Sequence, residues 1–131
     1  MHNLLTSLIT VTATPTYQGE STGFDDVYSI WSYNVVIKNY SSSSIRILSR
    51  YWKIIDSHGL IQEITGKGVI GQKPIIHPGS IFEYTSFTNL RASSGVMIGK
   101  YYAVEVQSGK KIEISIPAFS LDNPEEKTLL N

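Results

Sequence analysis

The chain has 131 residues and a mass of 14.6 kDa, the size of one domain. Its 17 isoleucines and 8 tyrosines against 4 alanines favour strands and argue against an all-α fold. Eleven basic and eleven acidic residues cancel, so no overall field attracts nucleic acid or an anionic membrane. Without cysteine, disulfides, thiol catalysis and thiolate-bound metals are excluded. No signal-peptide pattern and no membrane-spanning apolar run is present, so we expect a cytoplasmic protein.

The first two predicted strands alternate apolar and polar residues. Residues 9–14 alternate Ile, Val and Ala with threonine, and Pro15 is expected to end this strand. The polar stretch Gln18–Asp26 predicts a long loop. A second strand is predicted at 31–37, and the serine-rich residues 39–44 predict a hairpin turn to the next strand.

The third predicted strand, Ile45–Asp56, is apolar on both parities. Arg46 and Arg50 share the parity of Trp52, so either that face is partly open or a β-bulge changes the alternation. Arg50 has two interpretations. It is exposed on a binding face, or its stem packs while its guanidinium holds a carboxylate such as Glu83, and the second is favoured because arginine is rarely buried unpaired.

The remaining pattern predicts an all-β fold, an immunoglobulin- or fibronectin-III-like antiparallel β-sandwich of about seven strands. We expect a single domain over 1–131, with a core of about 8–121 that includes Trp52, Tyr84 and Tyr101, and a solvated tail at 122–131. Further strands are predicted at 60–64, 80–87, 94–106 and 112–116, the last ended by Pro117.

Residues 66–71, Gly-Lys-Gly-Val-Ile-Gly, match the dinucleotide-binding GxGxxG pattern. In a true site of this kind a helix follows and its N-terminus receives the phosphates, but Pro74 forbids that helix here. We therefore expect the three glycines to serve backbone conformation in a loop between two strands, with at least one at positive φ. The alternative is a nest of backbone amides for a phosphate. Its candidate ligand-binding residues are Gly66, Lys67, Gly68, Gly71 and Lys73.

No catalytic or metal-binding constellation is recognisable. The three histidines are far apart and form no HxH or HExxH pair, and no GxSxG elbow exists, so we predict no catalytic residue, no metal site and no cofactor. Ten of the eleven basic residues fall within 38–111. They are either solvated on the outer face of the strands or form a basic patch for an acidic partner or a phosphate.

Five ordered segments resemble the ApaG family. Together with Tyr33 and Asn39, the resemblance covers about residues 8–124. Departures occur at Tyr51, where the family has His, at Phe87, where it has Gly, and at Ala92-Ser93, where it has a Thr-Pro turn. The segments are 49–54 (SRHWxI in the family), 66–74 (GxGVVGxxP), 78–86 (PGxxFxYTS), 95–101 (GxMxGxY) and 116–121 (IPxFxL).

The resemblance implies a fibronectin-type-III-like sandwich without established enzymatic activity, in a domain that looks like a protein-binding module. We therefore expect a non-enzymatic binding module with a protein partner, and a homodimer is an open alternative. Two other functions remain as alternatives. One is nucleotide or pyrophosphate binding through the Gly66–Gly71 loop, and the other is an indirect role in cobalt or magnesium tolerance, a link that bacterial members carry by name.

Overall fold

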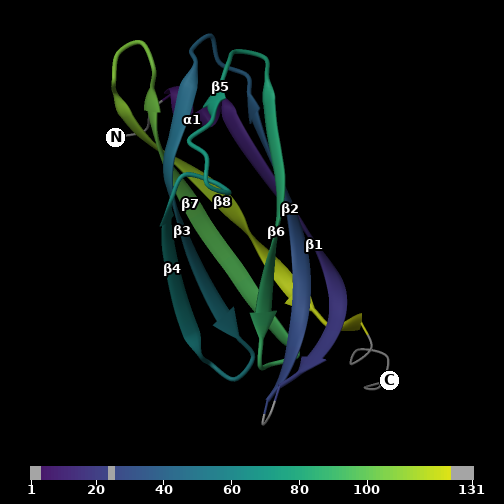
Figure 1. Cartoon of the computed structure of the whole chain (residues 1–131). Coiled ribbons are helices and arrows are strands. Elements are labelled where there is room, and N and C mark those ends of the chain that lie inside the picture. The colour runs from purple at the N-terminus through teal and green to yellow at the C-terminus, as the bar shows by residue number, and fades with distance from the viewer. Residues whose placement is uncertain (1–3, 24–25, 125–131) are drawn as a thin grey trace.

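The computed structural model describes residues 4–23 and 26–124 of the chain. They form two antiparallel sheets packed face to face (Figure 1), so the predicted all-β antiparallel sandwich is confirmed. The described strands number eight rather than about seven, because a two-residue strand was not predicted. The elements are α1 (Leu4–Ser7), β1 (Ile9–Thr22), β2 (Val27–Asn39), β3 (Ile45–Asp56), β4 (Ile61–Lys67), β5 (Ile75–Ile76), β6 (Ile81–Leu90), β7 (Ser94–Glu105) and β8 (Lys111–Asp122).

The two sheets differ in size and leave one side of the sandwich open. The three-stranded sheet has the order β1-β2-β6, and the five-stranded sheet has the order β4-β3-β7-β8, with β5 paired to β3. β1 packs against β8, which closes one side of the sandwich. β6 and β4 are the outer strands of the two sheets on the opposite side.

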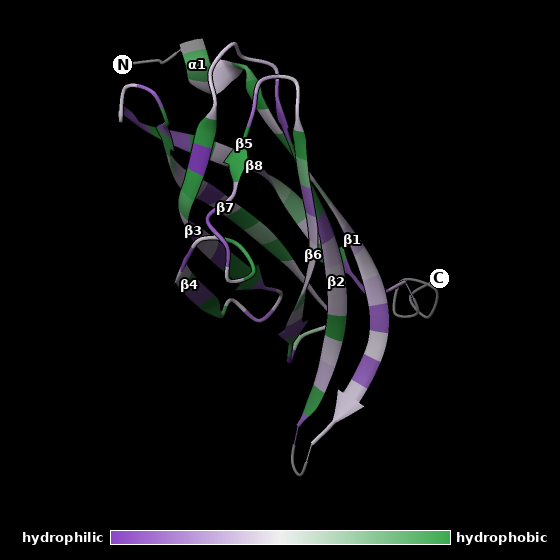
Figure 2. Ribbon diagram, turned by 45° about the horizontal axis from the view of Figure 1, so that its top comes forward, coloured by the Kyte–Doolittle hydropathy of each residue, from purple (hydrophilic) through white to green (hydrophobic). Residues whose placement is uncertain are grey.

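The core lies between the sheets and follows the alternation of the strands, which Figure 2 shows as bands of contrasting hydropathy. The predicted core residues Trp52, Tyr84 and Tyr101 are all buried, as expected. The largest fully buried side chains are Trp31, Tyr101, Ile37, Ile45, Ile47, Ile54, Ile76, Leu90, Met97, Ile114, Ile116 and Leu121.

A bulge in β3 explains why this strand is apolar on both parities. Its register with β7 shifts between Ile47 and Ser49. Ile47 faces the core before the shift, and Trp52 faces it afterwards although it has the opposite parity. Arg50 shares the parity of Trp52 beyond the bulge, so its side chain starts on the inward face of the sheet.

Two prolines that were expected to end strands do not. β1 continues past Pro15 to Thr22, so much of the predicted loop is strand, and β8 continues past Pro117 to Asp122. Both strands are at the edge of a sheet, where one side of the backbone needs no partner, and Pro117 lies where the register of β7 with β8 shifts. The missing amide hydrogen therefore costs little at either position.

Residues 40–44 do not form the predicted hairpin, because β2 and β3 belong to different sheets. The buried side chain of Asn39 holds this crossover. Its Nδ2 donates to the carbonyl oxygens of Ser43 (2.8 Å) and Ile76 (2.9 Å), and its Oδ1 accepts from the backbone N of Ser41 (2.9 Å). The donor and acceptor of the buried Asn39 side chain are thus both hydrogen-bonded, as buried polar groups require, and they hold the connection between the two sheets.

The predicted solvated tail at 122–131 begins too early, because residues 122 and 123 are part of the folded domain. Asp122 is the last residue of β8, and Asn123 is buried with its Nδ2 donating to the Tyr17 hydroxyl at 3.2 Å. The rest of the predicted tail, from residue 125, lies outside the described residues. Within 4–23 and 26–124, no helix is long and apolar enough to cross a bilayer.

Candidate functional site

The glycine motif at 66–71 begins in the last two residues of β4 and continues into a tight turn. The amide of Val69 donates to the carbonyl oxygen of Gln72 at 2.7 Å, and the amide of Gln72 donates back at 3.0 Å. The two central residues, Ile70 and Gly71, have φ of 48° and 69°, the signs of a type I′ turn. The predicted loop with a glycine at positive φ is confirmed for Gly68 and Gly71, whereas Gly66 was expected in the loop and lies within β4. Val69 is buried in the core, whereas Ile70 is exposed at the tip of the turn.

Gly66 and Gly68 exclude a side chain for different reasons. Gly68 has a φ of 61°, and a Cβ there would lie 2.0 Å from the carbonyl oxygen of Gln72. A Cβ on Gly66 would lie 2.6 Å from Cζ of Arg50. Gly68 thus permits the turn, whereas Gly66 makes room for a guanidinium.

Several amides of this loop already have acceptors within the protein. The amide of Gly68 donates to the carbonyl oxygen of Leu48 at 2.7 Å, and those of Val69 and Gln72 bond each other's carbonyls. These three groups are therefore not available for a phosphate without breaking the turn. The side chains of Lys67 and Lys73 are exposed, and a phosphate contact through them stays a prediction.

Arg50 is the residue around which the loop is organised. Its Nη1 donates to the carbonyl oxygens of Lys67 (3.1 Å) and Gly68 (3.0 Å). The expectation that Glu83 would hold this guanidinium is wrong, because Glu83 is exposed and the acceptors are backbone carbonyls. The loop carbonyls were missed because the bulge in β3, which decides where Arg50 points, has no sequence signal beyond the doubled parity.

A pocket of about 250 Å³ opens beside Arg50 on the unclosed side of the sandwich. Trp52 of β3 and Tyr33 of β2 lie at its apolar end, and their rings meet edge to face at 5.4 Å between centroids. Thr85 and Ser86 of β6 also line it, and Ser86 is the cross-strand neighbour of Tyr33. The pocket therefore combines aromatic rings with one cation and the inward-facing hydroxyl of Ser86, whereas the Thr85 hydroxyl accepts from Asn34 on the outer face of the sheet.

Two buried tyrosines lie behind this pocket. The hydroxyls of Tyr84 and Tyr101 share a hydrogen bond. Burial raises the pKa of Tyr84 to about 12, against an ordinary value of 10.0, although the hydrogen bond with Tyr101 lowers it. Burial also raises the pKa of Tyr101, and the neighbouring Tyr84 raises it further. Both groups therefore stay protonated where tyrosines of the unfolded chain ionise.

The free energy of unfolding is expected to fall as the pH rises from 10 towards 12, because the unfolded chain loses tyrosine protons that Tyr84 keeps. The slope is about 1.4 kcal/mol per pH unit for each tyrosine that ionises only in the unfolded chain. Urea denaturation across this range should give a shallower slope for Tyr84→Phe than for wild type. Equal slopes for wild type and Tyr84→Phe would contradict this assignment.

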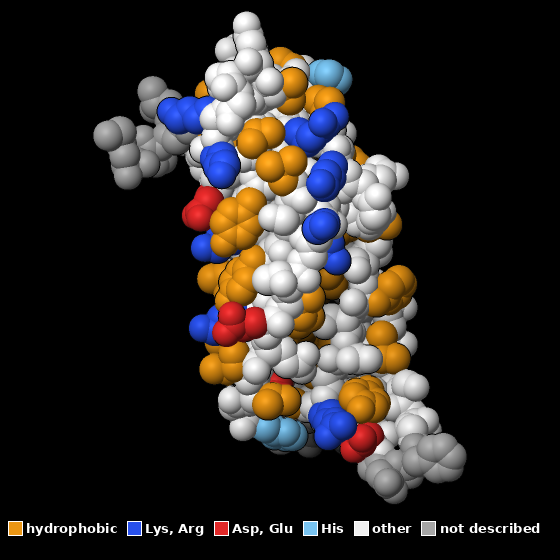
Figure 3. Space-filling view, turned by 60° about the vertical axis from the view of Figure 1, so that its left-hand side comes forward, with side chains coloured by type: hydrophobic (Ala, Val, Ile, Leu, Met, Phe, Trp, Pro, Cys, Tyr) orange, Lys and Arg blue, Asp and Glu red, His pale blue; other side chains and the backbone are white. Residues whose placement is uncertain are grey.

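The outer face of the five-stranded sheet carries a row of exposed apolar side chains. Strand pairing places Ile61, Ile55 and Val96 side by side across β4, β3 and β7, with 53%, 37% and 41% of their surface exposed. Ile98 follows on β7 with 44% exposed. Figure 3 shows apolar side chains running down one face of the molecule with lysines and arginines on both sides. We call Ile55, Ile61, Val96 and Ile98 the apolar row.

Aromatic and charged groups continue this face beyond the apolar row. The Nζ of Lys100 lies 5.8 Å from the ring centroid of Tyr51 and 5.5 Å from that of Tyr102. A hydrogen bond with the Tyr102 hydroxyl and the nearby Glu113 carboxylate, 4.0 Å away, raise the pKa of Lys100. The Tyr51 hydroxyl donates to Oε2 of Glu63 at 3.1 Å. The carboxylates of Glu63 and Glu113 thus both interact with side chains of the same face, Glu63 with Tyr51 and Glu113 with Lys100.

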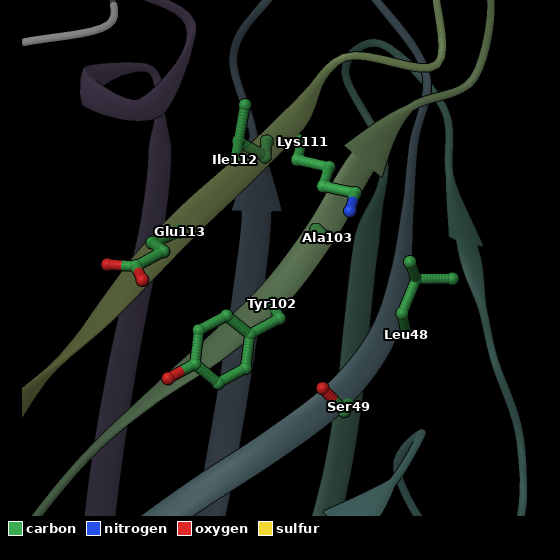
Figure 4. A pocket seen from close by; sticks show the side chains of 7 residues that line it. All are labelled: Leu48, Ser49, Tyr102, Ala103, Lys111, Ile112 and Glu113. Atoms are coloured by element: carbon green, nitrogen blue, oxygen red, sulfur yellow. The ribbon is translucent and has the colours of Figure 1, made fainter.

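A hollow of about 400 Å³ indents the same sheet further along (Figure 4). Tyr102 of β7 forms one wall, and Glu113 of β8 lies beside it. The side chain of Lys111 extends from β8 across β7 (Figure 4), and Ala103 of β7, whose side chain is buried in the core, also borders the hollow. The hollow is thus shallow, aromatic and cationic rather than an enclosed cavity.

The two described histidines lie in separate exposed turns. Nδ1 of His77 lies 3.0 Å from Oγ of Ser44, and the amide of His58 donates to Oδ1 of Asp56 at 2.9 Å. Within the described residues no three His, Asp or Glu side chains lie close enough to hold a metal ion. His2 lies outside the described residues.

Fold and site together define an antiparallel β-sandwich module in which a glycine turn is fixed by an inward-facing arginine. Residues 20–105 match the family model described as the ApaG domain. The chain belongs to the ApaG family, as the five sequence segments predicted.

Curated relatives match over nearly the whole length. The chain is 43% identical to Protein ApaG of Parvibaculum lavamentivorans over 131 residues, covering 100% of both chains. It is 43% identical to Protein ApaG of Sinorhizobium fredii over 124 residues, covering 95% of both. Among solved structures, the putative ApaA protein of Bordetella pertussis is 35% identical with a TM-score of 0.78, over 88% of this chain and 94% of that one. An X-ray structure of a structural-genomics target reaches a TM-score of 0.87 at 32% identity, covering 92% and 90%.

Proposed function

We propose that this fibronectin-type-III-like domain is a non-enzymatic cytoplasmic module that binds a protein partner through the outer face of its five-stranded sheet. The observation that carries the proposal is the apolar row. Ile61, Ile55 and Val96 are neighbours on three adjacent strands, and each is more than a third exposed. A continuous apolar surface of this kind on a folded domain is typical of a docking site for another protein.

The charges on this face indicate an acidic partner. Its two carboxylates are engaged, Glu63 by the Tyr51 hydroxyl and Glu113 by Lys100. Lys53 and Lys111 have no ion pair within the described part of the chain. Lys53 lies beside Ile98 of the apolar row, whereas Lys111 lies opposite Val104 at the other end of the same sheet. A second copy of the chain would oppose the same cations across a symmetric interface, which disfavours a homodimer through this face.

Affinity purification after chemical crosslinking tests this function. Tagged wild type, Ile98→Asp and the control Ile81→Asp are compared in cells of the source organism. Ile81 is an exposed isoleucine on β6, in the other sheet, so the control makes the same chemical change away from the face. We expect a protein that wild type and Ile81→Asp recover equally and that Ile98→Asp recovers at least about tenfold less, as for an interface hot spot. Equal recovery with all three baits would contradict the proposal.

Phosphate binding at 66–71 has less support. Lys67 and Lys73 supply positive charge there, but the amides of Gly68, Val69 and Gln72 are hydrogen-bonded within the protein. Calorimetric titration with ATP and pyrophosphate compares the two functions directly. Heat that disappears in Lys67→Ala would favour phosphate binding over the protein-binding role.

A further inference from the structure

We propose that the open side of the sandwich, between the edges of β4 and β6, is a second binding site that takes an extended peptide segment bearing a carboxylate. Two hollows of about 250 Å³ each lie along this side, and Phe87 of β6 borders both. One contains Arg50, and the other contains Ile64 and Gln62 of β4. This site is separate from the apolar row and does not depend on it.

The edge of β6 can pair with an added strand. β6 has ten residues and pairs with β2 along one edge only. Within the described residues, no backbone hydrogen bond joins its other edge to another strand. Residues 84–89 of this strand border the two hollows. An extended peptide is the ligand whose backbone matches such an edge, and its alternate side chains would enter the hollows.

Arg50 selects a carboxylate. Its Nη1 is held by the carbonyls of Lys67 and Gly68, and no described acidic side chain pairs with it. No described group accepts from its Nε or Nη2. Since Gly66 packs against the guanidinium, the group is fixed in place before any ligand arrives. A fixed guanidinium with free donors is suited to a carboxylate, and Ser86, on the inward face of β6, supplies a further hydroxyl.

The second hollow selects an apolar side chain. Ile64 pairs with Trp52 across β3 and β4, so it lies on the face of the sheet that is turned towards the core. It is nevertheless 42% exposed, because no strand covers this side. Ile30 of β2 lines the same hollow. The order of the hollows along β6 therefore predicts a segment with an acidic and an apolar residue a few positions apart.

A phage-displayed library of random short peptides, selected on the wild-type protein, tests this site. We expect the enriched peptides to share an acidic and an apolar residue. Changing their Asp or Glu to Asn or Gln should weaken binding at least about tenfold in fluorescence polarisation, because it removes the charge-assisted pair with Arg50. This change is made in the peptide, so it leaves the fold of the protein untouched.

Protein variants locate the site. Ile64→Asp should weaken binding at least about tenfold, because it places a charge in the apolar hollow, whereas Ile61→Asp, on the outer face of the same strand, should leave binding within about twofold. The reverse pattern, with loss only in Ile61→Asp, would move peptide binding to the apolar row and overturn this site. No enrichment of peptides, or equal binding of acidic and amide peptides, would also overturn it. If this peptide site is absent, the effect of Ile98→Asp on recovery of a protein partner is still expected, so the two proposals can fail independently.

Discussion

Gly68→Ala is expected to lower the free energy of unfolding by about 3 kcal/mol, the sum of backbone strain and a forced steric contact. The φ of 61° is unfavourable for alanine, and its Cβ would meet the backbone carbonyl of Gln72 at 2.0 Å. A carbonyl within a tight turn cannot move aside as a flexible side chain can. The turn must then open, and the bonds between Val69 and Gln72 are lost with it.

Two further variants distinguish the backbone strain in Gly68→Ala from its steric contact with Gln72. Gly71→Ala has a similar φ of 69° but no atom within 4 Å of the added Cβ, so it should cost only about 1 kcal/mol. Lys67→Ala removes an exposed side chain and should change stability by less than about 0.5 kcal/mol. Urea denaturation followed by tryptophan fluorescence measures all three. Equal losses for Gly68→Ala and Gly71→Ala would show that the contact with Gln72 is not decisive.

Trp52→Ala is expected to cost about 3–5 kcal/mol, a large share of the total stability of a domain of this size. Only 2% of Trp52 is exposed, and its ring packs edge to face against Tyr33 and Phe119, with centroids 5.4 Å and 6.0 Å away. Beneath it, Gly99 leaves space for the ring, since a Cβ there would lie 2.7 Å from Cε3 of the indole. Truncation thus leaves a cavity that flanking rings cannot fill.

The same truncation at an exposed aromatic residue is the control. Phe87→Ala on β6 should change the free energy of unfolding by less than about 0.5 kcal/mol, because its ring is mostly exposed. Thermal and urea denaturation of the two variants give the comparison. Losses of similar size would contradict the placement of Trp52 at the centre of the core.

The fold could be predicted from the sequence because the strands alternate so regularly, but the edges of the sheets could not. Pro15 and Pro117 were expected to end strands, and both lie within them. Proline is tolerated where one side of the backbone has no partner, and only the order of strands in the sheets reveals that β1 and β8 are at edges. The position of β1 and β8 at the edges of the sheets therefore mattered more than the local tendency of proline to end a strand.

The candidate sites were predictable in part. The glycine motif itself indicated a structural turn, because Pro74 left no room for a helix. The partner of Arg50 could not be predicted, since the bulge near Leu48 determines which way the side chain points. The apolar row was also not predictable, because Ile61, Ile55 and Val96 come from three strands and become neighbours only through the register of β3 with β4 and β7.

Site-specific photocrosslinking tests most directly the central claim that the outer face of the five-stranded sheet binds a protein. A photoreactive amino acid is placed at Ile98, at Ile61, or at the control position Ile81, which lies in the other sheet, in cells of the source organism. Ile98 and Ile61 are expected to crosslink to the same protein, and Ile81 is expected not to. Crosslinks that are equally strong at Ile81, or absent from both face positions, would contradict the account.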